Sequence, residues 1–361
     1  MNFKEIKIKE LIDFIESDFY KTSDIIPISR QRAISQAKNP SGNANDVALI
    51  LALDESEKII GYIGMLPGII TIDNFSYYWN SCWWVDSEKG KMAAMPLFYK
   101  MLKISNQKMI FFDLSEKTKA IIENFNFQTK TIDGFRCFLR FNFHAKLSNK
   151  NSFFKAIKSL LLLTDCGLNL FRSIPLFFWN IATHLENKSM KEIDNEAEIF
   201  ITKFKDTQLI PTQKNKINWI VKYPWIITQP NLQEKELSKR YFFSWISNSF
   251  SNKLLKVFKN QQIVGVLFFT FRDGDMKLPY SFFYNQDIDL IVQIIYQVAI
   301  ENHAMSFTTF NASITERISS KRHPFIFLKK IRKYIAYPKY CINLGIENKT
   351  IQDGDGDVVF C

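Results

Sequence analysis

The segment from Cys82 to Lys103 reads CWWVDSEKGKMAAMPLFYKMLK, and it decides the fold of the first half of the chain. Its pattern predicts a buried aromatic strand that ends at Val85, a short polar loop, and a helix that begins near Met92. The first backbone N–H groups of a helix have no partner within the helix and carry a partial positive charge. Lys89 and Lys91 add charge at the same point. The segment therefore predicts a binding site for phosphate groups.

The flanking sequence predicts the rest of an α/β fold. The expected strands of the first half span 47–53, 59–66, 76–85, 109–114 and 131–141, and the expected helices span 8–20, 29–38, 92–104 and 117–124. The first two strands form a hairpin across the polar turn at 54–58. This order of elements predicts a mixed sheet with helices on both faces.

The second half partly repeats this order. Lys58-Ile-Ile-Gly-Tyr-Ile-Gly aligns with Gln262-Ile-Val-Gly-Val-Leu-Phe, and each stretch is the second strand of an expected hairpin. The expected helices here span 193–204, 214–222, 231–247 and 287–302, and the expected strands span 254–259, 263–271, 276–284, 305–310 and 340–344. We therefore expect domains at 1–145 and 191–361, with an apolar and basic linker at 146–190.

The loop and helix start resemble those of the GNAT superfamily of acyl-CoA-dependent N-acyltransferases. That family carries [Arg/Gln]-x-x-Gly-x-[Gly/Ala] at this place, and the matching positions are Lys89, Met92 and Ala94. Met92 stands where the family has glycine, and Ile122 stands where it often has a tyrosine that protonates the leaving thiolate. The resemblance implies two tandem GNAT-like modules, distantly similar to FemAB-like transferases, of which the second is degenerate.

The resemblance also implies a site and its chemistry. Acetyl-CoA or another acyl-CoA would be the co-substrate, and its binding residues would be Trp84, Val85, Lys89, Gly90, Lys91, Met92, Ala93 and Ala94. The backbone N–H near Val85 would polarise the thioester carbonyl. Asp86 and Asp113 are the candidate carboxylates that remove the proton of the attacking amine.

Several partners stay open at this stage. The acceptor would be an amine, such as an amino sugar, a peptide amine or a cell-envelope precursor. A net charge of +11 also permits an aminoacyl-tRNA donor, as in FemAB-like transferases. The departures at Met92 and Ile122 permit a non-catalytic binding protein whose acyl-CoA site has decayed.

Other classes of site are disfavoured. The five cysteines, which form no CxxC pair, favour reduced thiols in the cytoplasm, and the four histidines lack metal-ligand spacing. Asp353-Gly-Asp-Gly-Asp is expected to be a turn rather than a metal loop. The sequence contains no GxGxxG, GxSxG or P-loop motif.

Segment 153–186 combines bulky apolar residues with lysines and arginine. Two interpretations are open: a linker packed between the domains, which we prefer, or a helix on an anionic membrane surface, which would place the protein at the inner membrane face. No run of about 18 uncharged apolar residues predicts a membrane-spanning helix.

Overall fold

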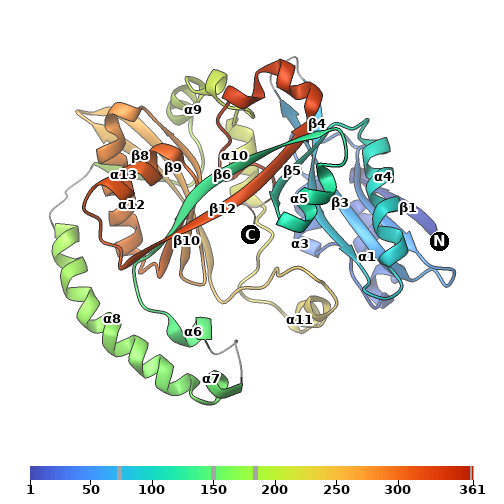
Figure 1. Cartoon of the computed structure of the whole chain (residues 1–361), viewed down its shortest axis with the longest axis horizontal. Coiled ribbons are helices and arrows are strands. Elements are labelled where there is room, and N and C mark those ends of the chain that lie inside the picture. Colours follow the sequence, from blue (N-terminus) through green and yellow to red (C-terminus); the bar gives the residue numbers. More distant parts are fainter. Residues whose placement is uncertain (71–74, 148–151, 182–185, 358–359, 361) are drawn as a thin grey trace. The chain divides into compact units, whose positions relative to one another are not determined.

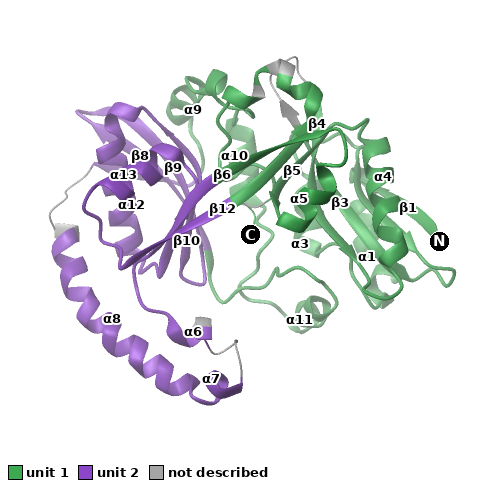
Figure 2. Cartoon of the chain, viewed as in Figure 1, with its two compact units in different colours: residues 1–132, 192–250, 333–361 green, residues 133–191, 251–332 purple. Residues whose placement is uncertain are grey.

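The computed structural model describes residues 1–70, 75–147, 152–181, 186–357 and 360. The chain forms two compact units (Figure 2). Unit 1 consists of residues 1–132, 192–250 and 333–361, and unit 2 consists of residues 133–191 and 251–332. These units differ from the predicted domains, because 192–250 and 333–361 belong to unit 1. The predicted linker 146–190 belongs to unit 2.

Unit 1 is built on a mixed sheet. Its strands are β1 (Asn2–Lys7), β2 (Val47–Leu53), β3 (Ile59–Ile70), β4 (Phe75–Val85), β5 (Met109–Leu114) and parts of β6 (Phe127–Phe138) and β12 (Phe327–Pro338). The strand order begins β1-β2-β3-β4-β5-β12. Neighbours from β1 to β4 are antiparallel, and β4 and β5 are parallel.

Helices cover both faces of this sheet. They are α1 (Leu11–Glu16), α2 (Asp18–Thr22), α3 (Arg30–Ala37), α4 (Ala94–Ile104), α5 (Glu116–Ile122), α9 (Asn195–Thr202), α10 (Lys214–Lys222) and α11 (Leu232–Lys239). Alternate residues of β2 enter two separate apolar cores, with Leu49 beside α1 and Ile50 beside α4. All seven residues of β2 are buried, as expected for a central strand.

Unit 2 contains the other strands of the same twelve-stranded mixed sheet. Its strands follow the order β6-β11-β10-β9-β8-β7, with β7 (Asn187–Met190), β8 (Phe250–Lys259), β9 (Gln262–Arg272), β10 (Asp275–Phe283) and β11 (Ser306–Thr309). Its helices are α6 (Phe143–Leu147), α7 (Ser152–Ala156), α8 (Lys158–Ile181), α12 (Ile288–Glu301) and α13 (Ala312–Ser320). Its core forms between the sheet and α12, with Ile291 and Ile295 fully buried. The predicted α/β class, with mixed sheets and helices, is confirmed.

The two units share one order of elements (Figure 1). In unit 1, β2, β3, β4, α4 and β5 follow each other, and in unit 2, β8, β9, β10, α12 and β11 do the same. In each set the third and last strands are parallel neighbours. The next strand is exchanged, because β12 pairs with β5 and β6 pairs with β11. This exchange explains why the units are discontinuous in sequence.

Some expectations differ from the structure. The expected strand at 340–344 is part of a 3-10 helix, Lys339–Leu344, and the last strand is β12. The expected helix 231–247 ends at Lys239 in α11. The linker contains α8, a helix of 24 residues. By length and apolar composition alone, its part Lys158–Trp179 could cross a membrane, although the sequence predicted no such helix.

A β-bulge interrupts the β3–β4 ladder. Ile63 pairs with Trp83 and Met65 pairs with Asn80, so that Ser81 and Cys82 together lie opposite Gly64. Cys82 has a φ of 81°, a left-handed conformation that is rare for residues other than glycine. A Cβ atom on Gly64 would lie 2.2 Å from the carbonyl oxygen of Ser81. The bulge therefore requires glycine at position 64.

Replacement of Gly64 by alanine should destabilise unit 1 by about 1–3 kcal/mol, because the backbone of β4 must move away from the added methyl group. Thermal unfolding followed by circular dichroism measures this change. Gly167→Ala is the control, because a Cβ atom there meets nothing within 4 Å and alanine favours the helix. An equal or smaller loss of stability in Gly64→Ala than in Gly167→Ala would contradict the assigned packing.

Candidate functional site

The parallel strands β4 and β5 separate soon after they meet. They pair only at Tyr78–Met109 and Trp79–Ile110, although β4 continues to Val85 and β5 to Leu114. The separation begins at the bulge, and bulges of this kind re-aim strands beside binding sites. The carboxyl ends of both strands therefore share no ladder bonds, and this opening in the ladder lies at the end of the sheet where ligands of α/β proteins commonly bind. Gly356 and Asp357 contact the two strands near this point, at Phe112 and Ser81.

The direction of one backbone group follows from the ladder. The N–H of Asp86 donates to the carbonyl of Ile60 in β3, at 2.9 Å. Successive N–H groups of an extended strand point to opposite edges. The N–H of Val85 therefore points away from β3 and toward the opening, as expected for a group that polarises a bound carbonyl.

The loop after β4 is held by its own first residue. The Oδ1 atom of Asp86 accepts hydrogen bonds from the backbone N–H groups of Glu88 and Lys89, at 2.9 and 2.8 Å. These bonds hold the pKa of the Asp86 carboxyl below its usual range. Gly90 closes the loop, since a Cβ atom there would lie 2.3 Å from the carbonyl of Ile60. Asp86 thus has a structural role in the loop.

The start of α4 is open to a ligand. A 3-10 turn, Lys91–Ala93, leads into the helix, and no side chain caps either element within this fully described segment. Lys89 and Lys91 are exposed beside it. The Met92 side chain is 85% exposed. The side chain that Met92 adds at this position therefore lies largely in solvent.

The other predicted residues lie at the same end of the sheet. Trp84 is half-buried and stacks on Tyr62, with ring centroids 5.4 Å apart. Ala93 is buried, and Ala94 is half-buried. Asp113 is exposed near the end of β5, with a φ of 56°. Because β4 and β5 are parallel neighbours, Asp113 near the end of β5 and the loop after Val85 lie at the same end of the sheet.

A shallow cavity of about 440 Å³ adjoins the loop. Its charged lining consists of Asp24, Asp54, Glu57, Lys58, Asp86, Glu88 and Lys89. Carboxylates outnumber the lysines, so the cavity favours a cationic group over a phosphate. An amine is the natural ligand for such a surface.

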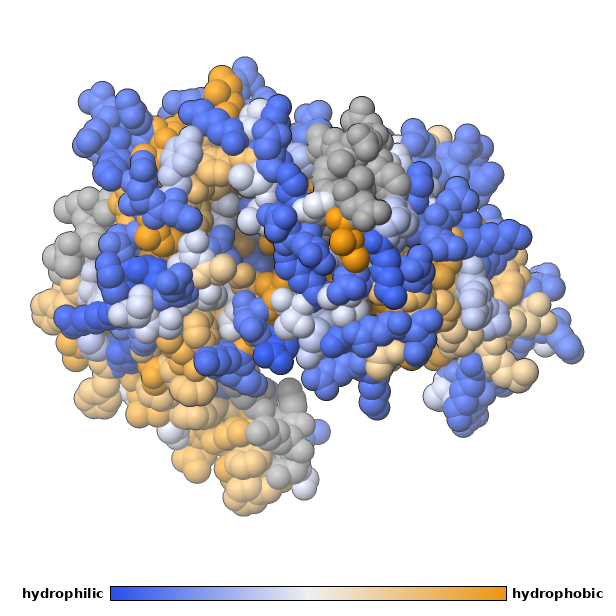
Figure 3. All heavy atoms as spheres, turned by 45° about the horizontal axis from the view of Figure 1, so that its top comes forward, coloured by the Kyte–Doolittle hydropathy of each residue, from blue (hydrophilic) through white to orange (hydrophobic). Residues whose placement is uncertain are grey.

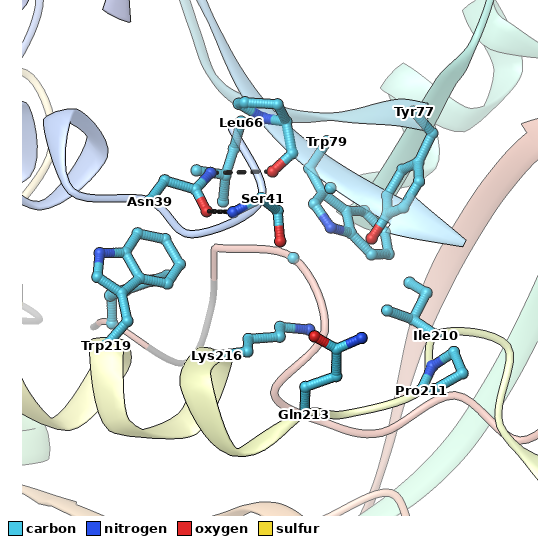
Figure 4. A pocket seen from close by; sticks show the side chains of 14 residues that line it. Asn39, Ser41, Leu66, Tyr77, Trp79, Ile210, Pro211, Gln213, Lys216 and Trp219 are labelled. Atoms are coloured by element: carbon cyan, nitrogen blue, oxygen red, sulfur yellow. Dashed lines mark hydrogen bonds between the residues drawn. The ribbon is translucent and has the colours of Figure 1, made fainter. Parts of the chain in front are cut away.

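A second, smaller pocket of about 50 Å³ lies on β4 (Figure 4). Trp79 and Tyr77 of β4 face Lys216 and Trp219 of α10 across it. Asn39 is fixed at its border, donating to the carbonyl of Pro67 at 3.0 Å and accepting from the N–H of Ser41 at 2.9 Å. The pocket is lined by aromatic surface with a few fixed polar groups, and its volume has room for a few water molecules.

The acidic segment 353–357 runs across the strands beside this pocket. Asp353 accepts from Lys333 of β12 at 2.8 Å, and Asp355 pairs with Lys216 of α10 at 3.1 Å. Asp357 accepts from the hydroxyl of Ser81, in the bulge of β4, at 2.7 Å. The sequence predicted only a turn here. The turn is present at 353–354, and the three carboxylates also fasten the segment to three separate elements.

Sequence reasoning also missed Arg32 of α3. Its side chain is buried and donates to the carbonyl and hydroxyl oxygens of Ser81 and to the hydroxyl of Tyr241. It also lies over the ring of Trp225, 4.4 Å from the centroid. No local signal marks Arg32, because its partners lie far away in the sequence.

Metal ligation has no support in the described part of the chain, where no group of three or more His, Cys, Asp or Glu residues could hold an ion. Cys82, Cys137, Cys166 and Cys341 are free thiols. Cys361 lies outside the described residues, as do positions 182–185 of the predicted membrane segment.

Comparison with known proteins gives only distant likenesses. No protein-family model matches the sequence, and no curated protein matches it. A probable N-acyltransferase from Enterococcus faecalis V583 is similar in structure, with 9% identity, a TM-score of 0.48, and coverage of 94% of this chain and 73% of that chain. N-myristoyltransferase from Saccharomyces cerevisiae with bound myristoyl-CoA has 9% identity, a TM-score of 0.47, and coverage of 93% and 78%.

A GCN5-related N-acetyltransferase from Kribbella flavida has 8% identity, a TM-score of 0.46, and coverage of 93% and 70%. Likenesses of this size do not assign an activity. The function proposed below rests on the chain's own geometry.

The loop at 86–90 should keep its form from neutral pH down to about pH 4 and loosen only below it, the usual range for an aspartate. The folded pKa of Asp86 is lowered, so its stabilising bonds are present above the ordinary pKa and are lost as pH falls through the lowered one. The amide NMR signals of Glu88 and Lys89 report this titration. Asp86→Asn is the control, because its amide oxygen still accepts but does not titrate. Movement of the wild-type signals between pH 5 and 7 would contradict the assignment.

Proposed function

We propose that the chain is an acyl-CoA-dependent N-acyltransferase whose site lies at the carboxyl ends of β4 and β5. The observation that carries this proposal is the opening between two parallel strands, bordered by a basic loop and an uncapped helix start. An extended chain bearing a phosphate-rich end matches both parts of this surface.

The donor would bind through its phosphates first. The N–H groups at the start of α4, together with Lys89 and Lys91, supply positive potential for the pyrophosphate of CoA. The pantetheine arm would lie between the separated ends of β4 and β5. Its thioester carbonyl would accept from the N–H of Val85, which stabilises the negative charge that develops on the oxygen.

The reaction needs no covalent enzyme intermediate. The acceptor nitrogen attacks the thioester carbon, the new C–N bond forms, and the C–S bond breaks to release the CoA thiolate. A cationic acceptor first loses one proton to solvent so that its nitrogen can attack, and a carboxylate takes the second proton as the C–N bond forms. Asp113 is our preferred base, because the Oδ1 atom of Asp86 already accepts two backbone hydrogen bonds.

The acceptor would be a cationic amine before it reacts. The carboxylate-rich cavity beside Lys89 supports such an acceptor. An amino sugar, a peptide amine or a cell-envelope precursor all fit this description, and acetyl-CoA is the simplest donor to test.

Reversal of both loop lysines, Lys89→Glu with Lys91→Glu, should weaken acyl-CoA binding by at least about tenfold, because two phosphate contacts are lost and replaced by repulsion. Isothermal titration calorimetry with acetyl-CoA and longer acyl-CoAs measures the effect. The matched control is Lys103→Glu with Lys235→Glu, which changes the net charge equally at exposed positions away from the loop.

An equal loss of affinity in the control pair would show that only overall charge matters. Failure of the wild-type protein to bind any acyl-CoA would reject the proposal. If the protein binds tRNA in a salt-sensitive way and does not bind acyl-CoA, the acyl donor is an aminoacyl-tRNA.

Asp113→Asn should lower kcat by about 100-fold or more while acyl-CoA affinity changes less than about twofold, because a general base acts on the acceptor. Asp86→Ala should instead weaken acyl-CoA binding, since the loop loses its two fixed N–H bonds. Steady-state kinetics and calorimetry on both variants separate these roles. Near-normal turnover in Asp113→Asn, with turnover lost in Asp86→Asn, would transfer the base to Asp86.

A further inference from the structure

Helix α8 presents a large apolar face to solvent. Seven of its apolar residues are between 59% and 74% exposed: Leu160, Leu163, Leu170, Phe171, Ile174, Phe177 and Phe178. Their spacing places them along one side of the helix. In Figure 3, hydrophobic residues gather along the lower left of the molecule, where Figure 1 places α8. Exposed apolar patches of this kind mark interaction surfaces.

The opposite side of α8 is attached to unit 2, through polar residues in the middle of the helix and through Leu176 and Trp179, which pack into the apolar core of the unit, nearer the end of the helix. Asp165 accepts from the backbone N–H groups of Phe143 and His144, each at 2.9 Å. Asn169 both accepts from and donates to the backbone of Phe141, at 2.9 Å. The polar residues in the middle of the helix thus bind the chain that follows β6.

Arg172 completes this attachment. It donates to the carbonyl of Leu139 at 3.4 Å and to the carbonyl of Pro324. A helix of a water-soluble domain normally turns its apolar side inward and its polar side to water. In α8 the outward side is apolar and the middle of the inward side is polar, so a helix packed on all sides, as in the linker that we preferred from the sequence, does not describe it. Its outer face suits an apolar phase rather than water.

The charged residues near this apolar face indicate the charge of the partner that it fits. Residues 143–181 contain five basic residues and one acid, and that acid, Asp165, is buried. Lys155, in α7, and Lys158, the first residue of α8, are exposed at the amino-terminal end of the helix. A surface that joins bulky apolar side chains to exposed lysines complements a bilayer with anionic headgroups.

The contacts of α8 favour a helix that lies on the bilayer. With 24 residues, α8 is about 36 Å long, which is enough to cross the hydrocarbon core. A crossing helix needs lipid-compatible surface on all sides. Asp165, Asn169 and Arg172 instead occupy the middle of α8 and bind unit 2. Only one face is free to enter lipid.

We propose that α8 docks the protein on an anionic membrane surface, with its apolar face inserted to the depth of the headgroups. This inference stands on unit 2 alone and does not depend on the proposed acyltransferase activity.

Flotation with lipid vesicles tests the proposal. The full chain should float with vesicles of phosphatidylcholine mixed with phosphatidylglycerol, bind less to phosphatidylcholine alone, and detach in alkaline carbonate as a surface-bound protein does. The variant Leu163→Ser/Leu170→Ser/Phe171→Ser/Phe178→Ser should bind anionic vesicles more than about tenfold less well, because apolar insertion supplies much of the affinity. These side chains are exposed, so the thermal unfolding of the variant should match that of the wild type.

The control is Leu232→Ser with Phe242→Ser, two exposed apolar residues of unit 1 that should leave vesicle binding unchanged. A second variant, Lys155→Glu with Lys158→Glu, should weaken binding to anionic vesicles only. Absence of vesicle binding by the wild type would overturn the proposal. A dimer in analytical ultracentrifugation that the four-serine variant abolishes, without vesicle binding, would assign the face to a second copy of the chain. Resistance to carbonate would replace surface docking with a spanning helix.

Discussion

The packing of α3, β4 and segment 353–357 in unit 1 depends on one hydrogen-bonding group, the backbone carbonyl of Ser81. The bulge turns this group out of the β3–β4 ladder, and the buried guanidinium of Arg32 donates to it. A buried guanidinium needs hydrogen-bond partners to offset its lost hydration. In the described part of the chain the Nη1 and Nη2 atoms of Arg32 have them and its Nε atom does not, so the bonds at Nη1 and Nη2 supply this compensation. The same guanidinium reaches Tyr241, while Ser81 holds Asp357. Helix α3, strand β4 and the acidic segment are therefore fixed to one another at the place where β4 leaves β5.

Local patterns in the sequence predicted much of this structure. The hairpins β2–β3 and β8–β9 and the helix Lys214–Lys222 were predicted because hydrophobic period and turn residues act over a few positions. The basic loop after Val85 was predicted for the same reason, and the structure places it beside an uncapped helix start. Its role in binding acyl-CoA stays a prediction.

What the sequence did not predict depends on distant partners. Strand β12 contains FLKKIRKYIAYP, in which lysines and arginine obscure the strand pattern, and its pairing with β5 joins positions more than 200 residues apart. Because β6 and β12 are exchanged between the units, the boundaries of both units differ from the domain boundaries predicted from the sequence. Arg32, Ser81 and Asp357 carry no shared motif, because only the folded sheet brings them together. The sequence could not predict that α8 is exposed, because a packed helix and a surface helix can have the same apolar composition.

The two units share one order of strands but differ at the helix that follows the third strand. In unit 1, the helix after the third strand begins beside Lys89 and Lys91. In unit 2, the corresponding helix α12 begins at Asp287, a buried residue that accepts from Lys259 at 2.8 Å. Asp289, in the first turn of α12, binds Arg317 and Lys321. Carboxylates at a helix start are stabilised by the dipole and repel phosphate. The start of α12 is therefore already occupied by the protein's own anions, whereas the start of α4 has the exposed lysines Lys89 and Lys91 beside it.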